Sequence, residues 1–112
     1  MKPEIITAIK AWIGNNLDQC LTADAIAERS GYNVHYFQRQ FSKIEGQPLA
    51  AYVRRKRVDA AAVALASSND SVMQIALDHG FIGARAFLLV FRRYYKQSPV
   101  AYRKAQRNRA SK

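Results

Sequence analysis

The chain has one cysteine, two histidines and no long apolar run. Cys20 is its single cysteine, which excludes an internal disulfide and a thiolate metal cluster and favours a reducing compartment. The longest apolar run, from Ala60 to Ala66, is far too short to cross a membrane, and the first residues lack the pattern of a signal peptide. We therefore expect a cytoplasmic protein that folds without a cofactor or metal and does not contact a membrane.

Acidic residues are also scarce. The 112 residues include 8 Asp and Glu against 18 Lys and Arg, so the formal net charge is +10 at pH 7. On so small a body this charge produces a positive field that suits a polyphosphate partner. The charge alone is compatible with a nucleic acid, an acidic lipid or plain solubility.

An internal repeat narrows these possibilities. One helix-turn-helix pattern occurs twice, at an offset of about fifty residues, which is typical of duplicated structural units. The first copy comprises Ile26, Ala27, Ser30, Gly31, Tyr32, Phe37, Phe41, Pro48 and Tyr52. The second copy comprises Ile75, Ala76, Gly80, Phe81, Phe87, Phe91, Pro99 and Tyr102. The repeat indicates two DNA-reading units in one chain.

The first unit begins with a helix whose apolar residues, within Ile5–Leu17, recur at helical spacing and place Trp12 in the core. Thr22 is expected to cap a short second helix, and Gly31 to supply the permissive backbone of the turn that follows it. Asn33 is expected to cap the third helix. These signals predict three helices before the first break in the chain.

The third helix separates into an apolar and a polar face. The inward face is formed by residues that recur at spacings of three and four, namely Val34, Phe37, Phe41 and Ile44. A separate polar stripe is formed by His35, Gln38, Arg39 and Ser42. We expect the packing to leave this stripe exposed and the stripe to enter a DNA groove.

A long helix is expected from Leu49 to Ala66, because Gln47-Pro48 breaks the chain and no Gly or Pro follows. Its apolar stripe changes sides, with Leu49, Tyr52 and Val53 on one face and Val58, Ala61, Ala62 and Leu65 on nearly the opposite one. The two halves are therefore expected to pack on different units. A helix of about eighteen residues is roughly 27 Å long, comparable to the roughly 34 Å between successive major-groove faces.

The second unit starts after a loop at residues 67–70, where Ser71 and Gln74 have the spacing of a capping box and His79-Gly80 ends the helix. Inward residues of its recognition helix are expected to be Ala84, Phe87, Phe91 and Tyr94. The exposed face then carries Arg85, Leu88, Leu89 and Arg92. A last short helix follows Ser98-Pro99 with Tyr102 inward, and the basic tail from Arg103 to Lys112 is expected to fray.

Together these patterns predict an all-α fold of about seven helices, in which a long linker helix joins two helix-turn-helix subdomains. The expected division is residues 1–48 for the first subdomain, 49–66 for the linker helix, 67–106 for the second subdomain and 107–112 for a basic tail. A monomer of this kind would span two consecutive major grooves. Because the two units differ in sequence, the combined DNA site should be asymmetric.

The polar stripe of the first unit carries side chains that can read base edges. Arg39 can donate two parallel hydrogen bonds to guanine O6 and N7, and Gln38 can pair with adenine N6 and N7. His35 can stack on a base or form a hydrogen bond to its edge near the start of the helix. The alternative for all three residues is an ordinary solvated helix face.

The exposed face of the second unit is less polar. Leu88 and Leu89 either touch thymine methyl groups or form a small patch for another protein. Arg85 is expected to contact a base or a phosphate. The residues expected on backbone phosphates are Asn33, Ser42, Lys43, Arg54, Arg55, Arg92 and Arg93. The basic run Arg54–Arg57 is alternatively a solvated stretch.

With these motifs the chain resembles the DNA-binding region of the AraC/XylS family of bacterial transcription regulators. The resemblance extends from about Ala8 to Arg103. Its carriers are Ile26-Ala27, Ser30-Gly31-Tyr32, Phe37-Gln38-Arg39-Gln40-Phe41, Ile75-Ala76, Gly80-Phe81, Phe87, Phe91-Arg92-Arg93 and residues 98–103. Because Met1 lies just ahead of the first expected helix, the chain is most similar to the short members that have no sensor domain.

The resemblance implies a seven-helix fold, monomeric binding to a degenerate promoter element, and activation through contact with RNA polymerase. It implies base contacts at His35, Gln38, Arg39, Arg85, Leu88 and Leu89. The short members are controlled by their abundance, so no small-molecule ligand is expected. Two departures matter, because His35 replaces the tryptophan of the short members and Leu89 replaces their base-contacting arginine. The half-site of the second unit is therefore open.

Three other functions compete with this interpretation. A sequence-indifferent DNA-packaging protein would share the charge but would not need two distinct stripes. The DNA-binding module of a ligand-responsive regulator would share both features. An enzyme is not expected, because His35 and His79 belong to different units and the acidic residues show no metal or nucleophile spacing. Cys20 is interpreted as an incidental thiol.

Overall fold

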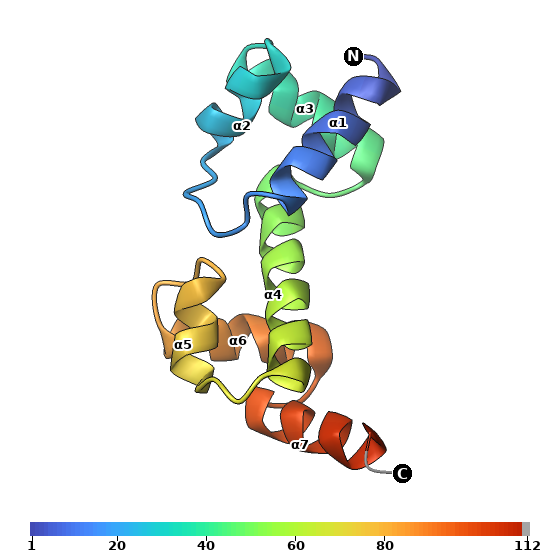
Figure 1. The fold of residues 1–112 in the computed structure, drawn as a ribbon. Coiled ribbons are helices and arrows are strands. Elements are labelled where there is room, and N and C mark those ends of the chain that lie inside the picture. The colour runs from blue at the N-terminus through green and yellow to red at the C-terminus, as the bar shows by residue number, and fades with distance from the viewer. Residues whose placement is uncertain (111–112) are drawn as a thin grey trace. The chain divides into compact units, whose positions relative to one another are not determined.

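The computed structural model describes residues 1–110, which form seven helices and no strand. The helices are α1 (Pro3–Gly14), α2 (Ala23–Ser30), α3 (Val34–Glu45), α4 (Leu49–Ser67), α5 (Val72–Asp78), α6 (Ala84–Tyr95) and α7 (Pro99–Ala110) (Figure 1). The predicted all-α fold of about seven helices is therefore confirmed. The last two residues of the expected basic tail, 111 and 112, lie outside the described residues.

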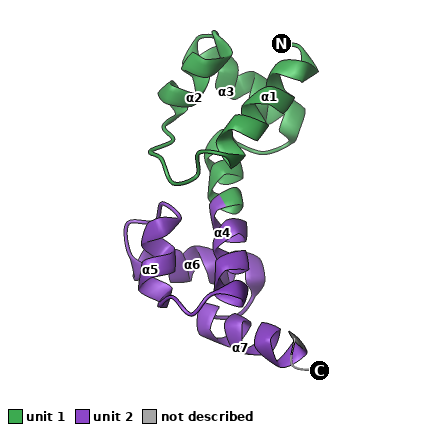
Figure 2. Ribbon diagram, viewed as in Figure 1, with its two compact units in different colours: residues 1–56 green, residues 57–112 purple. Residues whose placement is uncertain are grey.

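The chain divides into two compact units, unit 1 (Met1–Lys56) and unit 2 (Arg57–Lys112) (Figure 2). The boundary between them falls inside α4, so this helix contributes residues to both units. The finer division of the chain at residues 48, 66 and 106 stays a prediction.

Unit 1 has a core to which each of its helices contributes one apolar face. The buried residues are Ile6, Ile9 and Ile13 of α1, Ile26 and Ala27 of α2, Phe37 and Phe41 of α3, and Leu49, Tyr52 and Val53 of α4. The ring of Phe41 contacts that of Tyr52 edge-on, with centroids 5.4 Å apart. The first half of α4 thus packs as its apolar stripe predicts.

Two residues at the margin of this core differ from the expectation. Trp12 is half-buried and packs against the core, and its ring lies 5.2 Å from the guanidinium carbon of Arg29. Ile44 is 43 % exposed, so its predicted inward position is wrong. Ile44 lies in the last turn of α3, just before the chain reverses at Gly46, and the space beside Phe41 is taken by Tyr52 of α4.

The helix ends of unit 1 follow the capping signals in the sequence. The Thr22 hydroxyl accepts a hydrogen bond from the backbone N–H of Ala25 at 3.1 Å. Gly31 ends α2 with a φ of 79°, a left-handed conformation that favours glycine. The side chain of Asn33 caps α3. These local signals fix the turn between α2 and α3.

Unit 2 has a separate core built on the second half of α4. Its buried residues are Val58, Ala61, Ala62 and Leu65 of α4, Ile75 and Ala76 of α5, and Phe87 and Phe91 of α6. Phe91 stacks on Tyr95 at a centroid distance of 4.5 Å and meets Tyr102 of α7 edge-on at 5.4 Å. The change of sides in the α4 stripe and the inward position of Tyr102 are confirmed.

The start of α5 confirms only half of the predicted capping box. The Ser71 hydroxyl accepts a hydrogen bond from the backbone N–H of Gln74 at 3.1 Å. The Gln74 side chain, however, donates to Oδ1 of Asp78 at 2.7 Å. A capping box would instead need the side-chain oxygen of Gln74 to accept from the backbone N–H of Ser71. The bond to Asp78, one turn further along the same helix, turns the Gln74 side chain away from the helix start.

The C-terminal helix is longer and better anchored than the sequence suggests. The Arg103 guanidinium donates to the carbonyl oxygens of Leu65 (2.9 Å) and Asp70 (2.6 Å). That of Arg107 donates to the carbonyl oxygen of Ser68 (2.6 Å) and to Oδ1 of Asn69 (2.7 Å). Over residues 103–110, which the structure describes as helical, the expected fraying is therefore wrong. The two arginines of α7 thus donate to one carbonyl in the last turn of α4 and to oxygen atoms of the loop that follows it.

Candidate nucleic-acid interface

The polar stripe of α3 is turned outward by the burial of the opposite side of the helix. Phe37 and Phe41 are fully buried, which fixes the rotation of α3 about its axis. His35 and Arg39 are exposed, and Gln38 is half-buried. With Ser42, also half-buried, these residues recur at three and four along one helix and share one face. The structure thus brings the four predicted residues of this stripe together.

Asn33 has a structural task at the start of this stripe. Its Oδ1 accepts hydrogen bonds from the backbone N–H groups of His35 at 2.9 Å and Tyr36 at 3.4 Å. The oxygen therefore serves the cap, and the amide nitrogen is the part of Asn33 that can donate to a phosphate. Lys43 is exposed one turn after Arg39, so it extends the same face toward the C-terminal end of α3.

In unit 2, α6 is fixed in the same way by two buried rings, Phe87 and Phe91. Arg85 is exposed, Leu88 is half-buried, and Leu89 is 69 % exposed. The two arginines near the end of the helix, Arg92 and Arg93, are exposed. This face therefore carries two leucines in the middle of α6, with Arg85 before them and Arg92 and Arg93 after them.

Sequence reasoning missed one prominent residue of this face, Ile82. It lies in the loop before α6 and is 94 % exposed. The signal was present in the repeat, because the segment from Gly80 to Phe87 is one residue longer than that from Gly31 to Phe37. The additional residue lies in the turn, and Gly83 then takes the N-cap position of α6 without a side-chain cap.

The four basic residues of the run Arg54–Arg57 in α4 differ in exposure and in the groups they contact. Arg55 and Lys56 are exposed and Arg54 is half-buried. Nζ of Lys56 lies 5.5 Å from the centroid of the Tyr52 ring. Arg57 is half-buried, and its guanidinium packs beside Gly80 within unit 2. Arg57 therefore has a packing role, which leaves Arg54 and Arg55 as the phosphate candidates of the run.

One buried ionisable group lies between the helices of unit 1. Burial raises the pKa of the Tyr52 hydroxyl above its ordinary value of 10.0, while Lys10 lowers it and Glu45 raises it. Nζ of Lys10 pairs with Oε1 of Glu45 at 3.1 Å and lies 5.7 Å from the centroid of the Tyr52 ring. Lys10 thus joins α1 to α3 and α4.

Other kinds of site find little support within residues 1–110. This part of the chain holds no group of three or more histidine, cysteine or carboxylate side chains that could share a metal ion. It also holds no helix with the length and apolarity needed to cross a bilayer. Nδ1 of His79 lies 2.7 Å from the carbonyl oxygen of Ile75, so His79 sits at the end of α5 as the sequence predicts.

Comparison with known proteins agrees with this geometry. Residues 26–105 match the family model described as a helix-turn-helix domain. The chain is 38 % identical over 100 residues to the regulatory protein SoxS of Escherichia coli K12, covering 89 % of this chain and 94 % of SoxS. It is 42 % identical over 99 residues to the transcriptional activator AarP of Providencia stuartii, covering 88 % of this chain and 73 % of AarP.

A solved structure shows the same fold. The DNA-binding domain of the global transcriptional factor AdpA, crystallised in complex with a target DNA, superposes with a TM-score of 0.87 at 30 % identity. The match covers 93 % of this chain and 94 % of that domain. Sequence, fold and the duplicated helix-turn-helix units agree, and the chain belongs to the AraC/XylS family of helix-turn-helix transcription regulators.

Proposed function

We propose that this protein is a sequence-specific transcription activator that binds an asymmetric promoter element as a monomer, with α3 and α6 in the major groove. The observation that carries the proposal is the matched construction of the two helices. In each, two fully buried phenylalanines fix the rotation, and the opposite face carries exposed side chains suited to DNA. The AdpA domain, which has the same fold, is described in complex with its target DNA.

In unit 1, base readout is assigned to His35, Gln38 and Arg39. The exposed Arg39 has the geometry to bind guanine O6 and N7 with two hydrogen bonds, and Gln38 the geometry to bind adenine. Each good bidentate pair contributes about 1–3 kcal/mol of discrimination against the wrong base. His35, at the first turn of α3, would meet a base edge or stack on a base.

In unit 2, base contacts are assigned to Arg85, Leu88 and Leu89. The exposed Leu89 would supply more apolar contact than the half-buried Leu88. Phosphate contacts are assigned to the amide of Asn33 and to Ser42, Lys43, Arg54, Arg55, Arg92 and Arg93. Phosphate contacts fix register and orientation, so this set would position the two reading helices rather than choose the sequence.

A relative supports the assignment of activation. AarP is described as a transcriptional activator, and it shares 42 % identity with this chain. We therefore assign activation through contact with RNA polymerase, at a surface away from the DNA-reading faces. The protein would act in the cytoplasm, on the nucleoid when bound, without a small-molecule ligand.

Selection of bound duplexes from a random library tests this function most directly. The expected product is one asymmetric motif of two short blocks about one helical turn apart, bound by one protein molecule. Affinity for the selected and for random duplexes is then measured across a salt series. Equal affinity for both, with a steep salt slope, would identify a sequence-indifferent DNA-binding protein. A palindromic motif bound by two molecules would contradict the monomeric mode.

A further inference from the structure

The loop before α6 exposes an apolar side chain to solvent, because the turn holds the preceding residue inward. Phe81 is fastened inward, because its backbone N–H donates to the carbonyl oxygen of Ala76 at 3.0 Å and its ring meets Phe87 edge-on at 5.0 Å. The next residue, Ile82, is 94 % exposed. Because Phe81 is held inward, the turn leaves Ile82 in solvent. In the unbound protein Ile82 therefore lacks the hydrophobic free energy that burial of its side chain would contribute.

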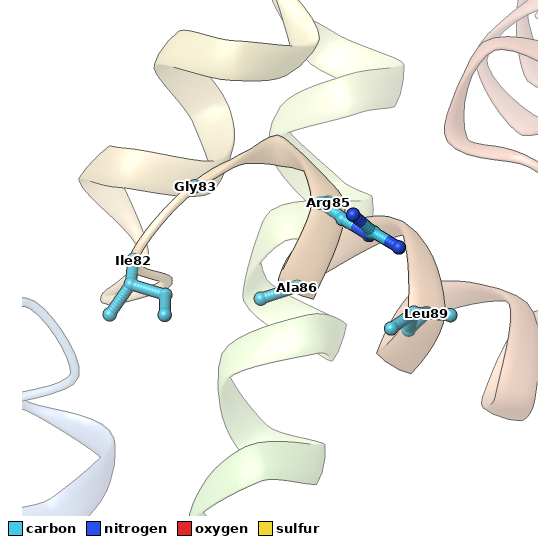
Figure 3. Close-up of a pocket in the computed structure, with 5 residues that line it drawn as sticks. All are labelled: Ile82, Gly83, Arg85, Ala86 and Leu89. Carbon is cyan, nitrogen blue, oxygen red and sulfur yellow. The ribbon is translucent and has the colours of Figure 1, made fainter.

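Ile82 forms one side of a shallow hollow of about 380 Å³, lined also by Gly83, Arg85, Ala86 and Leu89. Figure 3 shows Ala86 between Ile82, which comes from the loop, and Leu89, which comes one turn further along α6. Gly83 and Ala86 keep the middle of this hollow free of bulk, since a Cβ on Gly83 would meet nothing within 4 Å. The hollow is therefore apolar, with Arg85 at its edge.

The charge around this hollow indicates which kind of group binds there. The helix α6 contains no acidic residue and three arginines, Arg85, Arg92 and Arg93, all of them exposed. An apolar spot within a basic face complements a methyl group surrounded by phosphates. In B-DNA the thymine methyl is the apolar group on the major-groove edge of the bases. A neutral apolar protein surface would gain nothing from the arginines.

We propose that this hollow receives the 5-methyl group of a thymine in the half-site read by unit 2, and that Ile82 is a specificity-determining residue. The proposal rests on the proposed function, because it requires α6 to enter the major groove. It assigns a role to Ile82 and Ala86 besides Leu89. It predicts a preference for thymine at the base pair that faces Ile82, Ala86 and Leu89.

Replacing thymine by uracil tests the proposal, because this change removes the methyl group and keeps the base pair. Each thymine of the selected element is replaced singly by deoxyuridine, and the Kd of the full chain is measured. The wild type should bind about fourfold more weakly at the position where the hollow receives the methyl group, as expected for one buried methyl group. In Ile82→Ala the ratio at that position should fall toward one. Val63→Ala, at a residue of α4 that is 67 % exposed, should keep the wild-type ratio.

The outcomes separate this proposal from the function on which it rests. If the protein binds selectively but no uracil substitution changes the Kd, the proposal that the hollow binds a thymine methyl group is wrong and the proposed function stands. A uracil response that Ile82→Ala and Leu89→Ala both leave unchanged places the methyl contact elsewhere and also overturns the proposal for the hollow. Loss of activation in Ile82→Ala with all Kd values unchanged would make the hollow a protein contact. Absence of any selective binding overturns both.

Discussion

The guanidinium group of Arg57 packs directly over Gly80, so that a Cβ on Gly80 would lie 2.8 Å from both Cζ and Nε of Arg57. Gly80 follows the end of α5 and has a φ of 84°, in the left-handed region. The turn that leads to α6 therefore favours glycine through its backbone conformation, and a Cβ at this position would also displace the end of the Arg57 side chain.

Gly80→Ala should consequently destabilise the protein more than Gly31→Ala does. Gly31 has a similar φ of 79° but nothing within 4 Å of its Cβ position, so its substitution incurs only the conformational cost, roughly 1–2 kcal/mol. We expect a larger loss at Gly80, measured by urea unfolding, and expect Arg57→Ala to remove the excess. Equal losses at the two glycines would mean that the arginine moves aside without cost.

Arg103→Ala should lower the free energy of unfolding by about 1–3 kcal/mol, because it leaves carbonyl oxygens of Leu65 and Asp70 without this donor. Arg109→Ala is the matched control, since it removes the same charge from an exposed position of the same helix. It should change the unfolding midpoint little. A similar loss in both variants would attribute the effect to charge rather than to these hydrogen bonds.

Stability at alkaline pH should depend on Tyr52. Its folded pKa is raised, mainly by burial, so the stability present below pH 10.0 is lost as the pH rises through the folded pKa. Between about pH 9 and 11, the wild-type melting temperature should fall further than that of Tyr52→Phe. Parallel curves for the two proteins would show that the fold does not oppose ionisation at this position.

Arg39→Ala and Arg92→Ala should weaken DNA binding in different ways. Arg39→Ala is expected to cost about 1–3 kcal/mol and to relax preference at one base pair, because a bidentate contact is lost. Arg92→Ala should weaken binding to all sequences alike and reduce the salt slope by about 1. Competition assays with single-base variants of the selected element, at several salt concentrations, distinguish the two. A uniform loss in Arg39→Ala would show that its assigned role is wrong.

The sequence predicts the framework of both units because its signals are local and redundant. The caps at Thr22 and Asn33, the turn at Gly31 and the buried phenylalanines of α3 and α6 each need only a few neighbouring residues. The two opposed stripes of α4 were predictable for the same reason. A stripe that changes sides within one helix requires two separate partners.

The errors arise where the environment of a residue depends on how the helices and turns pack, which no local pattern gives. Ile44 continues the apolar period of α3 but is exposed in the last turn of that helix. Arg103 belongs to a basic segment whose composition is typical of a frayed tail. Its order depends on hydrogen bonds to the loop after α4, which is distant in the sequence. Ile82 is invisible to periodicity, because it lies in a turn and its exposure depends on how Phe81 is anchored.

The helix α4 crosses the boundary between the units without interruption. Starting a helix is costly, whereas extending an existing one adds a hydrogen bond for each residue ordered. Whichever unit folds first therefore provides an already formed helical turn from which the α4 residues of the other unit can extend. Neighbouring repeats of a solenoid promote one another's folding in a similar way. Two hydrophobic cores that share no buried residue are in this way linked through a common backbone.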